Sequence, residues 1–498
     1  MGVLDGLKPE KVFHFFEEIS QIPRGSGNEK QISDYLKKFA QDRGLACIQD
    51  NLYNIIIIKE ATPGYEEEEP YILQGHMDMV AVKKPDCDID MTKDPLRLCI
   101  KDGRICADGT SLGGDDGIAV AYILALLDAD DISHPRLEVI VTTEEETGLR
   151  GAKGIDLSML CGRQLINLDN EEEGVIITSC AGGARVDVCI PVQREEVSAQ
   201  KTEILQIKVK GLLGGHSGSE IDKGRGNANC LLGHVLNKLA ETFSIRLADA
   251  RGGQADNAIP REASAVLVIP TGEKENILAC IDMEKKRIKE QLQSADPDFT
   301  IEYMEEESAE RLYFNGTQIE QCVSSASTKQ VLSCLAALPN GVIAMSGDVE
   351  GLVQTSLNLG IMALETESLH LAYAVRSSID QEKQELCRRI EEIAGQAAAT
   401  ATVRSSYPGW AYRKDSPLRD RLAAVFEKMY NRRPKLLAIH AGLECGLLAA
   451  KIPELDCVSI GPDMSDVHTT EESISIDSVA RVWEYLLAVL AEKESGKA

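Results

Sequence analysis

Five short stretches of this chain end an apolar run in a histidine or a carboxylate. Neutral imidazoles and carboxylate oxygens are the ligands that a pair of borderline divalent metals prefers. Two adjacent metals that share a hydroxide would make the chain a hydrolase. The stretches are residues 75–78, 114–117, 144–148, 167–169 and 467–469.

The first two stretches combine acids with either a histidine or glycines. His76 and Asp78 follow the apolar run 71–73, and residues two apart on an extended segment share a face, so one can bind a metal while the other orients it. Asp115 lies between glycines, which let the backbone approach an ion closely. Alone, the first pattern is also typical of a surface turn and the second of a helix N-cap.

Each of the other three stretches, taken alone, can also be explained without a metal site. The consecutive glutamates 144–146 repel one another unless cations compensate, but such a run is usually a solvated loop. Asp169 ends an apolar run and could likewise belong to a solvated loop. His468 follows a predicted strand in a turn, where a single histidine is usually a surface residue. Only the five stretches together indicate a metal site.

Short apolar runs, separated by helical patterns, must position these residues. Runs that are buried on both faces predict a largely parallel sheet in an α/β domain. In open α/β sheets, ligands bind at the carboxyl ends of the strands, where the stretches fall. The predicted strands are 54–58, 71–74, 137–142, 164–168, 436–440 and 457–460, and the predicted helices are 9–20, 28–43, 118–127, 417–430, 443–450 and 477–493.

The pattern changes after Gly183 and returns to α/β character from Tyr412. Strands and helices alternate over residues 204–292, and a similar order recurs over 329–399. We therefore predict a domain formed by residues 1–184 and 406–498, interrupted by an inserted α+β domain at 185–405 with two similar halves. A single irregular insert is the alternative.

Composition limits the classes of function. The chain has 498 residues, is 43% hydrophobic and 27% charged, and is long enough for two domains. A net charge of −27 disfavours binding to nucleic acid or anionic membrane. No apolar run approaches ~18 residues, no signal peptide is evident, and the 14 cysteines form no CxxC pair. We expect a cytoplasmic protein with reduced thiols.

The five stretches, in this order, resemble those of the co-catalytic zinc peptidase clan, which includes aminoacylases, carboxypeptidases and carnosinases. Within the clan, the chain is most similar to the aminoacyl-histidine dipeptidases. The resemblance implies a catalytic α/β domain interrupted by a lid domain, and hydrolysis of unblocked dipeptides, with Xaa-His dipeptides among the candidates. It covers nearly the whole chain and rests also on residues 73–80, 166–174, 180–183, 214–218, 256–262 and 439–447.

The resemblance implies two zinc ions per subunit, although cobalt or manganese would fit the same ligands. His76 and Asp169 would hold one ion, Glu146 and His468 the other, and Asp115 would bridge them. Each ion would then have three protein ligands and an open position for a shared water. The four positive charges of two such ions match three carboxylates and one hydroxide.

Two further residues of these stretches receive roles from the resemblance. Asp78 would orient His76, and Glu145 would be the general base that takes a proton from water and passes it to the leaving amine. The family pattern Glu-Glu-x-Gly, placed on Gly148, distinguishes Glu145 from the ligand Glu146. The family also has a cis peptide after the bridging residue, here between residues 115 and 116.

The inserted domain would also serve the site. His216 resembles the lid histidine that donates to the oxyanion, which in many clan members comes from a partner subunit. The lid here is longer than usual and could take the place of that partner subunit. Both a monomer and a homodimer are therefore compatible with the sequence. Asn257, Arg376, Gly442 and Glu444 resemble substrate-holding positions, and the fork of Arg376 suits a carboxylate. A structural loop role is the alternative for each.

Two other functions compete with a dipeptidase. An N-acyl amino acid amidohydrolase of the same clan would use the same metal site on a blocked substrate. A non-catalytic binding protein on this scaffold would usually have lost the base or a ligand, and here Glu145 and every proposed ligand are present.

Overall fold

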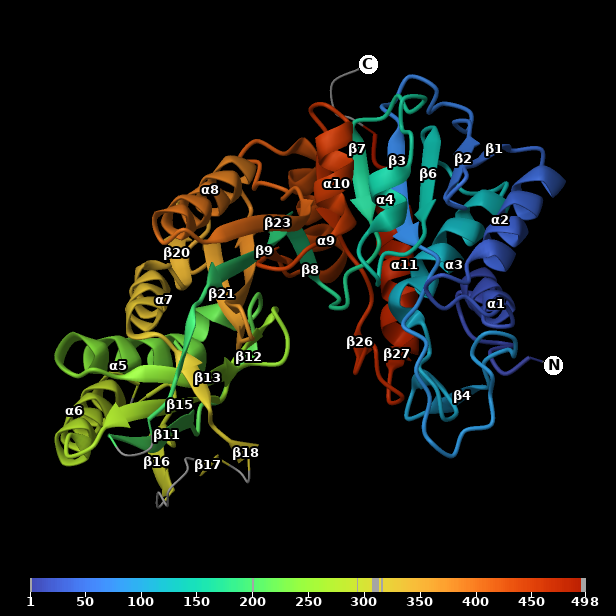
Figure 1. The fold of residues 1–498 in the computed structure, drawn as a ribbon. Helices are drawn as coiled ribbons and strands as arrows, with labels where there is room; N and C mark the ends of the chain where they lie inside the picture. The colour runs from blue at the N-terminus through green and yellow to red at the C-terminus, as the bar shows by residue number, and fades with distance from the viewer. Residues whose placement is uncertain (1, 199–200, 293, 307–312, 315–316, 494–498) are drawn as a thin grey trace. The chain divides into compact units, whose positions relative to one another are not determined.

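The computed structural model describes residues 2–198, 201–292, 294–306, 313–314 and 317–493, which form two compact units (Figure 1). The first unit contains Met1–Cys180, Tyr412–Ala438 and Leu443–Ala498. The second contains Ala181–Ala411 and Ile439–Gly442. The sequence predicted boundaries at 184/185 and 405/406, and it had no signal that groups residues 439–442 with the second unit.

The first unit is built on an eight-stranded sheet in the order β1-β2-β6-β3-β7-β25-β8-β24. The four central strands, β6, β3, β7 and β25, are parallel, as predicted. β1, β2 and β8 pair antiparallel with their neighbours, so the sheet as a whole is mixed. A short turn joins β1 to β2, which is possible only for antiparallel strands. The strands are β1 (Ala46–Gln49), β2 (Ile55–Lys59), β3 (Tyr71–His76), β6 (Leu137–Thr142), β7 (Gln164–Asn167), β8 (Val175–Cys180), β24 (Lys435–Ile439) and β25 (Asp456–Ser459).

Helices cover both faces of this sheet, which explains its continuously apolar strands. Tyr71 and Leu73 belong to one buried cluster with most of the helices, whereas Ile72 between them is buried on the opposite face. α10 packs against β25 and α4. Every helix and strand that the sequence predicted for this unit is present. The helices are α1 (Glu10–Ile19), α2 (Lys30–Asp42), α3 (Gly114–Asp128), α4 (Arg150–Gly154), α9 (Pro417–Tyr430), α10 (Glu444–Lys451) and α11 (Ile476–Ala491).

A small antiparallel sheet, which the sequence did not reveal, completes the first unit. Its order is β26-β27-β5-β4. Two of its strands are so short that they leave no readable alternation, and they hold both ends of the loop that contains His468. The strands are β4 (Leu98–Lys101), β5 (Arg104–Ala107), β26 (Met464–Ser465) and β27 (Ser473–Ser475).

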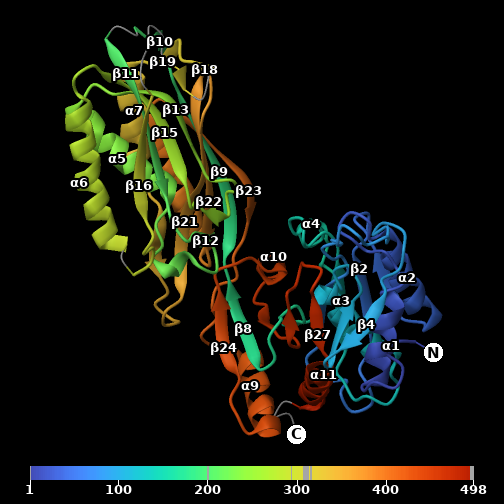
Figure 2. The same ribbon diagram turned by 90° about the horizontal axis from the view of Figure 1, so that it is seen from below.

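The second unit is built on a nine-stranded sheet in the order β16-β11-β15-β13-β21-β22-β9-β23, with β20 paired to β21. Four helices share one buried cluster with alternate strand residues, and Figure 2 shows α5 and α6 beside these strands. The strands are β9 (Gly182–Pro191), β11 (Thr202–Lys210), β13 (Arg246–Gly252), β15 (Ala263–Pro270), β16 (Thr300–Glu306), β20 (Gly341–Met345), β21 (Val353–Leu364), β22 (Ser368–Ser377) and β23 (Thr400–Tyr407). The helices are α5 (Ala228–Thr242), α6 (Lys274–Leu292), α7 (Ser325–Ala337) and α8 (Asp380–Gln396).

The sheet of the second unit joins two sets of strands edge to edge. β13 pairs with β21 through Arg251 opposite Ala363 and Gly252 opposite Met362. The equivalence of the two sets as similar halves stays a prediction. Short elements complete the unit: β10 (Arg194–Glu196), β12 (Gly215–His216), η1 (Ile221–Lys223), β14 (Ala258–Ile259), β17 (Tyr313–Phe314), β18 (Thr317–Gln318) and β19 (Gln321–Val323). Among the described residues of both units, no helix is both long and apolar enough to span a membrane.

Candidate active site

His76 is the last residue of the fully buried strand β3. A Cβ on its neighbour Gly75 would lie 2.6 Å from Asp116 and 2.7 Å from Ala119, so this glycine lets α3 lie against the strand. The Nδ1 atom of His76 is 3.2 Å from the Asp78 carbonyl oxygen and 3.4 Å from an Asp78 carboxylate oxygen. A proton on Nδ1 is therefore favoured, which leaves the lone pair on Nε2 for a metal.

The carboxylate of Asp115 lies between the two predicted histidine ligands. One oxygen is 2.9 Å from Nε2 of His76 and the other is 3.1 Å from Nε2 of His468. Asp115 and Asp116 have non-helical backbone angles at the start of α3, and the peptide between them is cis, as the resemblance implied. One carboxylate therefore faces two imidazoles, each through its own oxygen.

The three consecutive glutamates have different surroundings. Glu144 forms an ion pair with Arg150 at 3.0 Å. Glu146 places one oxygen 3.0 Å from Nε2 of His468, and its other oxygen is buried without a hydrogen-bond partner among the described residues. The backbone N–H groups of Glu145 and Glu146 donate to the two oxygens of Asp78 at 3.1 and 3.3 Å. Asp78 therefore contacts both His76 and the glutamate stretch, a link that the sequence did not predict.

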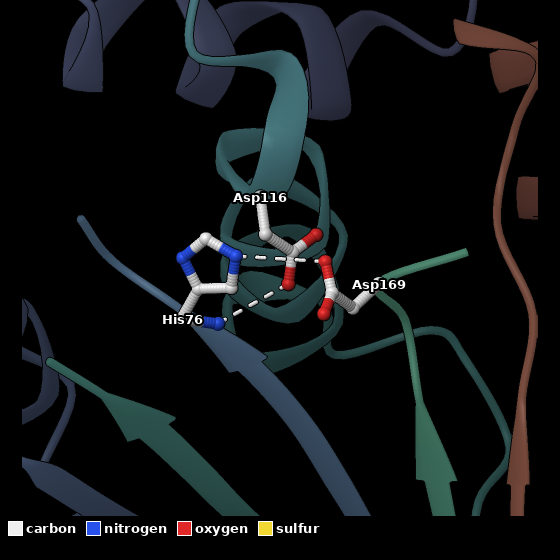
Figure 3. Close-up of side chains that lie close together, drawn as sticks. All are labelled: His76, Asp116 and Asp169. Atoms are coloured by element: carbon white, nitrogen blue, oxygen red, sulfur yellow. Dashed lines mark hydrogen bonds and ion pairs between the residues drawn. The ribbon is translucent and has the colours of Figure 1, made fainter. Parts of the chain in front are cut away.

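Among the described residues, three groups of side chains have ligand atoms within 4.8 Å of one another and could hold metal ions. All five predicted ligands occur in these groups. Asp116 also occurs, although the sequence analysis assigned it no role. It accepts the N–H of His76 at 3.1 Å, and Figure 3 shows it with Asp169 beside the His76 ring. The groups are His76, Asp116 and Asp169; His76, Glu145 and Glu146; and Asp115, Glu146 and His468.

The cluster has too little positive charge for its carboxylates. Burial and the charge of Asp115 raise the pKa of Asp169 well above its usual value. Burial raises the pKa of Glu145 to about 8, and the neighbouring carboxylates contribute. Hydrogen bonds to Asp115 and Glu146 raise the pKa of His468 to about 11. Divalent cations would supply the missing charge, so the residues fit a metal centre.

Glu444 lies in the first unit at the start of α10 and is completely buried. One carboxylate oxygen accepts hydrogen bonds from Gln74 at 2.5 Å and Thr142 at 2.6 Å, and the other has no partner among the described residues. Burial raises its pKa to about 8, and the charge of Glu145 contributes. It therefore retains one buried acceptor that could receive a substrate donor.

His216 and Arg376 lie together in the second unit. Nδ1 of His216 accepts N–H groups from Gly218 at 3.3 Å and Ser219 at 3.2 Å, which places the ring proton on Nε2. Nη2 of Arg376 is 3.5 Å from that Nε2. Burial, together with the charge of Arg376, lowers the pKa of His216, so the neutral ring is favoured. Two donors thus stand side by side, where one anionic oxygen could accept from both.

The remaining predicted residues of the second unit have differing surroundings. Asn257 lines the same hollow as His216. A Cβ on Gly442 would lie 2.9 Å from the ring of Tyr407, which favours a packing role for this glycine. His440 received no role from the sequence; it is a buried residue whose Nε2 is 2.7 Å from Oγ of Ser356 and whose pKa burial lowers to about 4. No spacing in the sequence connects residues so far apart.

Histidines and carboxylates grouped at the strand ends of an α/β sheet define the class of metal-dependent hydrolases. The chain belongs to peptidase family M20/M25/M40, whose family model matches residues 72–492. The resemblance to this kind of peptidase and the predicted α/β fold are thereby confirmed.

The chain is similar to two dipeptidases over nearly its whole length. It is 36% identical over 492 residues to the cytosol non-specific dipeptidase of Escherichia coli (strain K12), covering 99% of both chains. The crystal structure of aminoacylhistidine dipeptidase from Vibrio alginolyticus matches with a TM-score of 0.91 and 35% identity, over 98% of this chain and 97% of that one. Aminopeptidase PepT from Bacillus cereus ATCC 10987 shares the fold, with a TM-score of 0.59 and 18% identity over 97% and 98% of the two chains.

Proposed function

We propose that the chain is a metal-dependent dipeptidase that hydrolyses unblocked dipeptides in the cytoplasm. Membership of the peptidase family supports the reaction class. Similarity along 99% of both chains to a protein named as a cytosol dipeptidase supports the substrate class and the location. The position of the Asp115 carboxylate between His76 and His468 is the observation that carries the mechanism.

His76 and Asp169 would hold one metal ion in this proposal, and Glu146 and His468 would hold a second. Asp115 would help to hold both ions, because its two oxygens face the two imidazoles. One buried oxygen of Glu146 has no hydrogen-bond partner in the described part of the chain, which supports a cation at this place. Divalent ions held by these residues would supply a Lewis acid for the scissile carbonyl and would lower the pKa of a bound water. Zinc suits this mixed nitrogen and oxygen set, and cobalt or manganese also fits.

Glu145 is the general base of the proposed reaction. Its backbone is fixed through the N–H bond to Asp78, and bound metal charges would lower the pKa that burial raises. As a carboxylate it takes a proton from the attacking water, and as a carboxylic acid it passes that proton to the leaving amine.

Residues of the second unit bind the substrate in this proposal. Nε2–H of His216 donates to the oxyanion of the tetrahedral intermediate. The guanidinium of Arg376 receives the C-terminal carboxylate, because its fork can donate two hydrogen bonds to one carboxylate. Asn257 and Gly442 help to form the substrate-binding site in this proposal. A monomer and a homodimer differ in which subunit supplies His216.

Glu444 favours a dipeptide with a free amino group over an N-acyl amino acid. One of its buried oxygens has no partner among the residues that the structure describes, and a cationic donor satisfies such an oxygen best. The ammonium group of an unblocked dipeptide supplies that donor, whereas an acetylated amine does not. The competing amidohydrolase therefore requires a substrate that leaves this acceptor unsatisfied.

Activity on paired substrates tests the proposal. The chelated protein is reconstituted with zinc, manganese or cobalt and assayed on free dipeptides and on the matching N-acetyl amino acids. We expect metal-dependent hydrolysis of the free dipeptides, and Glu145→Gln is expected to lose about 10²–10⁴-fold in rate while it retains its metal. Preference for the N-acetyl compounds would instead establish the amidohydrolase, and no turnover with either set would establish a binding protein.

A further inference from the structure

Two buried charged residues that the proposed mechanism does not use lie next to the ligand loops of the first unit. Arg24, between α1 and α2, is 1% exposed, and Glu472, just before β27, is 3% exposed. Both contact the stretch 112–115, which ends in Asp115. Buried charges are expensive, so the contacts that keep them buried indicate what they do.

Arg24 connects the loop of His76 with the loop of Asp115. Its Nη1 donates to the carbonyl oxygens of Met77 at 3.1 Å and Asp78 at 3.3 Å, and its Nη2 donates to the carbonyl oxygen of Gly113. A planar guanidinium can hold two segments at once in this way, which a lysine ammonium cannot do with the same geometry.

Glu472 connects the loop of Asp115 with the loop of His468. One carboxylate oxygen accepts the N–H groups of Leu112 at 2.9 Å and Gly113 at 3.0 Å. The other accepts those of Gly114 at 2.7 Å and Asp115 at 3.4 Å. Its own N–H donates to the carbonyl oxygen of Thr469, so it is tied to the turn that carries His468.

The glycines of this stretch make room for the two charges. Gly113 has a φ of 66°, which favours glycine, and a Cβ there would lie 2.7 Å from Nη2 of Arg24. A Cβ on Gly117 would collide with the same guanidinium, whereas one on Gly114 would first meet the side chain of Ile474, with Glu472 at 3.3 Å. Gly113 thus contacts both charges: its N–H donates to Glu472, and its carbonyl oxygen accepts from Arg24.

We propose that Arg24 and Glu472 are positioning residues that hold His76, Asp115 and His468 at the spacing required by two metal ions. The inference rests on the proposed metal centre, because it concerns how that centre is kept in shape. Neither residue touches the substrate. Their effect is on the backbone of residues 112–115 and, through it, on the Asp115 carboxylate.

Glu472→Gln tests the inference, because glutamine has the same shape but turns one acceptor oxygen into a donor. That donor would face two backbone N–H groups. Glu138→Gln is the matched control. Glu138 is also a fully buried carboxylate in this unit and accepts the backbone N–H groups of Cys161 and Gly162, in contacts that involve none of the proposed ligands.

Three quantities are measured on the full chain: zinc affinity by titration of the chelated protein, thermal midpoint, and amide hydrogen exchange. We expect Glu472→Gln to weaken zinc binding by about 10- to 100-fold and to speed exchange at residues 112–115. Glu138→Gln should speed exchange at 161–162 and leave zinc affinity unchanged, even where both variants lower the thermal midpoint equally. Arg24→Lys, the milder variant, should weaken zinc binding in the same direction and serves if Glu472→Gln does not fold.

Wild-type zinc affinity in both Glu472→Gln and Arg24→Lys would overturn the inference, as would equal losses in Glu472→Gln and Glu138→Gln. Dipeptidase activity of the unchanged protein is assayed alongside. If the unchanged protein hydrolyses dipeptides and the variants keep their zinc affinity, only the positioning role is refuted. If the unchanged protein binds zinc but does not hydrolyse dipeptides, only the proposed function is refuted. If the unchanged protein binds none of zinc, manganese and cobalt, both are refuted.

Discussion

The contacts of Asp78 predict a large loss of activity in Asp78→Asn. The Asp78 carboxylate accepts N–H groups from Glu145 at 3.1 Å and Glu146 at 3.3 Å, and the hydroxyl of Ser26 at 2.8 Å. It also lies 3.4 Å from Nδ1 of His76. Asparagine keeps the shape but removes the charge and points an amide N–H₂ at one of these donors.

The expected magnitude follows from the contacts that are lost. A hydrogen bond to a charged group contributes about 1.5–3 kcal/mol, and at least one such bond becomes a clash between donors. Loss of the charge next to His76 also weakens the preference for a proton on Nδ1. Together these changes correspond to a loss of about 10²–10³-fold in kcat/KM, since each 1.4 kcal/mol is a factor of ten.

Steady-state kinetics on a free dipeptide at saturating zinc, with zinc affinity measured in parallel, provides the assay. Ser26→Ala is the control, because it removes only one of the donors to Asp78 and should cost less than tenfold. Unchanged kcat/KM and zinc affinity in Asp78→Asn would refute the view that this carboxylate orients His76 and the glutamate stretch.

Two further predictions concern different parts of the molecule. His216→Ala should lower kcat by about 10²–10³-fold with zinc affinity intact. Activity that reappears when it is mixed with Glu145→Gln would show that a partner subunit supplies His216, and no recovery would show that each chain supplies its own. Burial raises the pKa of Glu173, but hydrogen bonds from Arg481 and Ser478 outweigh this and lower it. Arg481→Gln should therefore cost about 1 kcal/mol near neutral pH, and the difference should vanish as the pH falls through the lowered pKa, as followed by denaturant unfolding. A loss that does not depend on pH would contradict this origin.

The regular elements were predictable because periodicity is local. The strand at residues 137–142 has the predicted bounds, and the helix at 417–430 also does. The parallel pairing of the central strands followed from apolar runs separated by helices. Strands of two or three residues, such as β26 and β27, carry too few residues to show alternation, and the antiparallel outer strands depend on pairings between distant segments.

The composition of the site was predictable only in part. Spacing and resemblance placed His76, Asp115 and His468 in one group, and the structure brings them together. Asp116 received no role from the sequence, because its nearness to His76 and Asp169 depends on the folded backbone. Arg24 and Glu472 act on backbone atoms of a loop distant in sequence, and no pattern of residue types reveals such a contact.

In the proposed centre, Asp115 would join two metal ions. Zinc titration of the chelated protein, with the metal content measured after removal of free ions, tests it directly. We expect two zinc ions per chain in the unchanged protein, and in Asp115→Asn the loss or marked weakening of at least one of them. A single bound ion in the unchanged protein, or two ions held with undiminished affinity by Asp115→Asn, would contradict it.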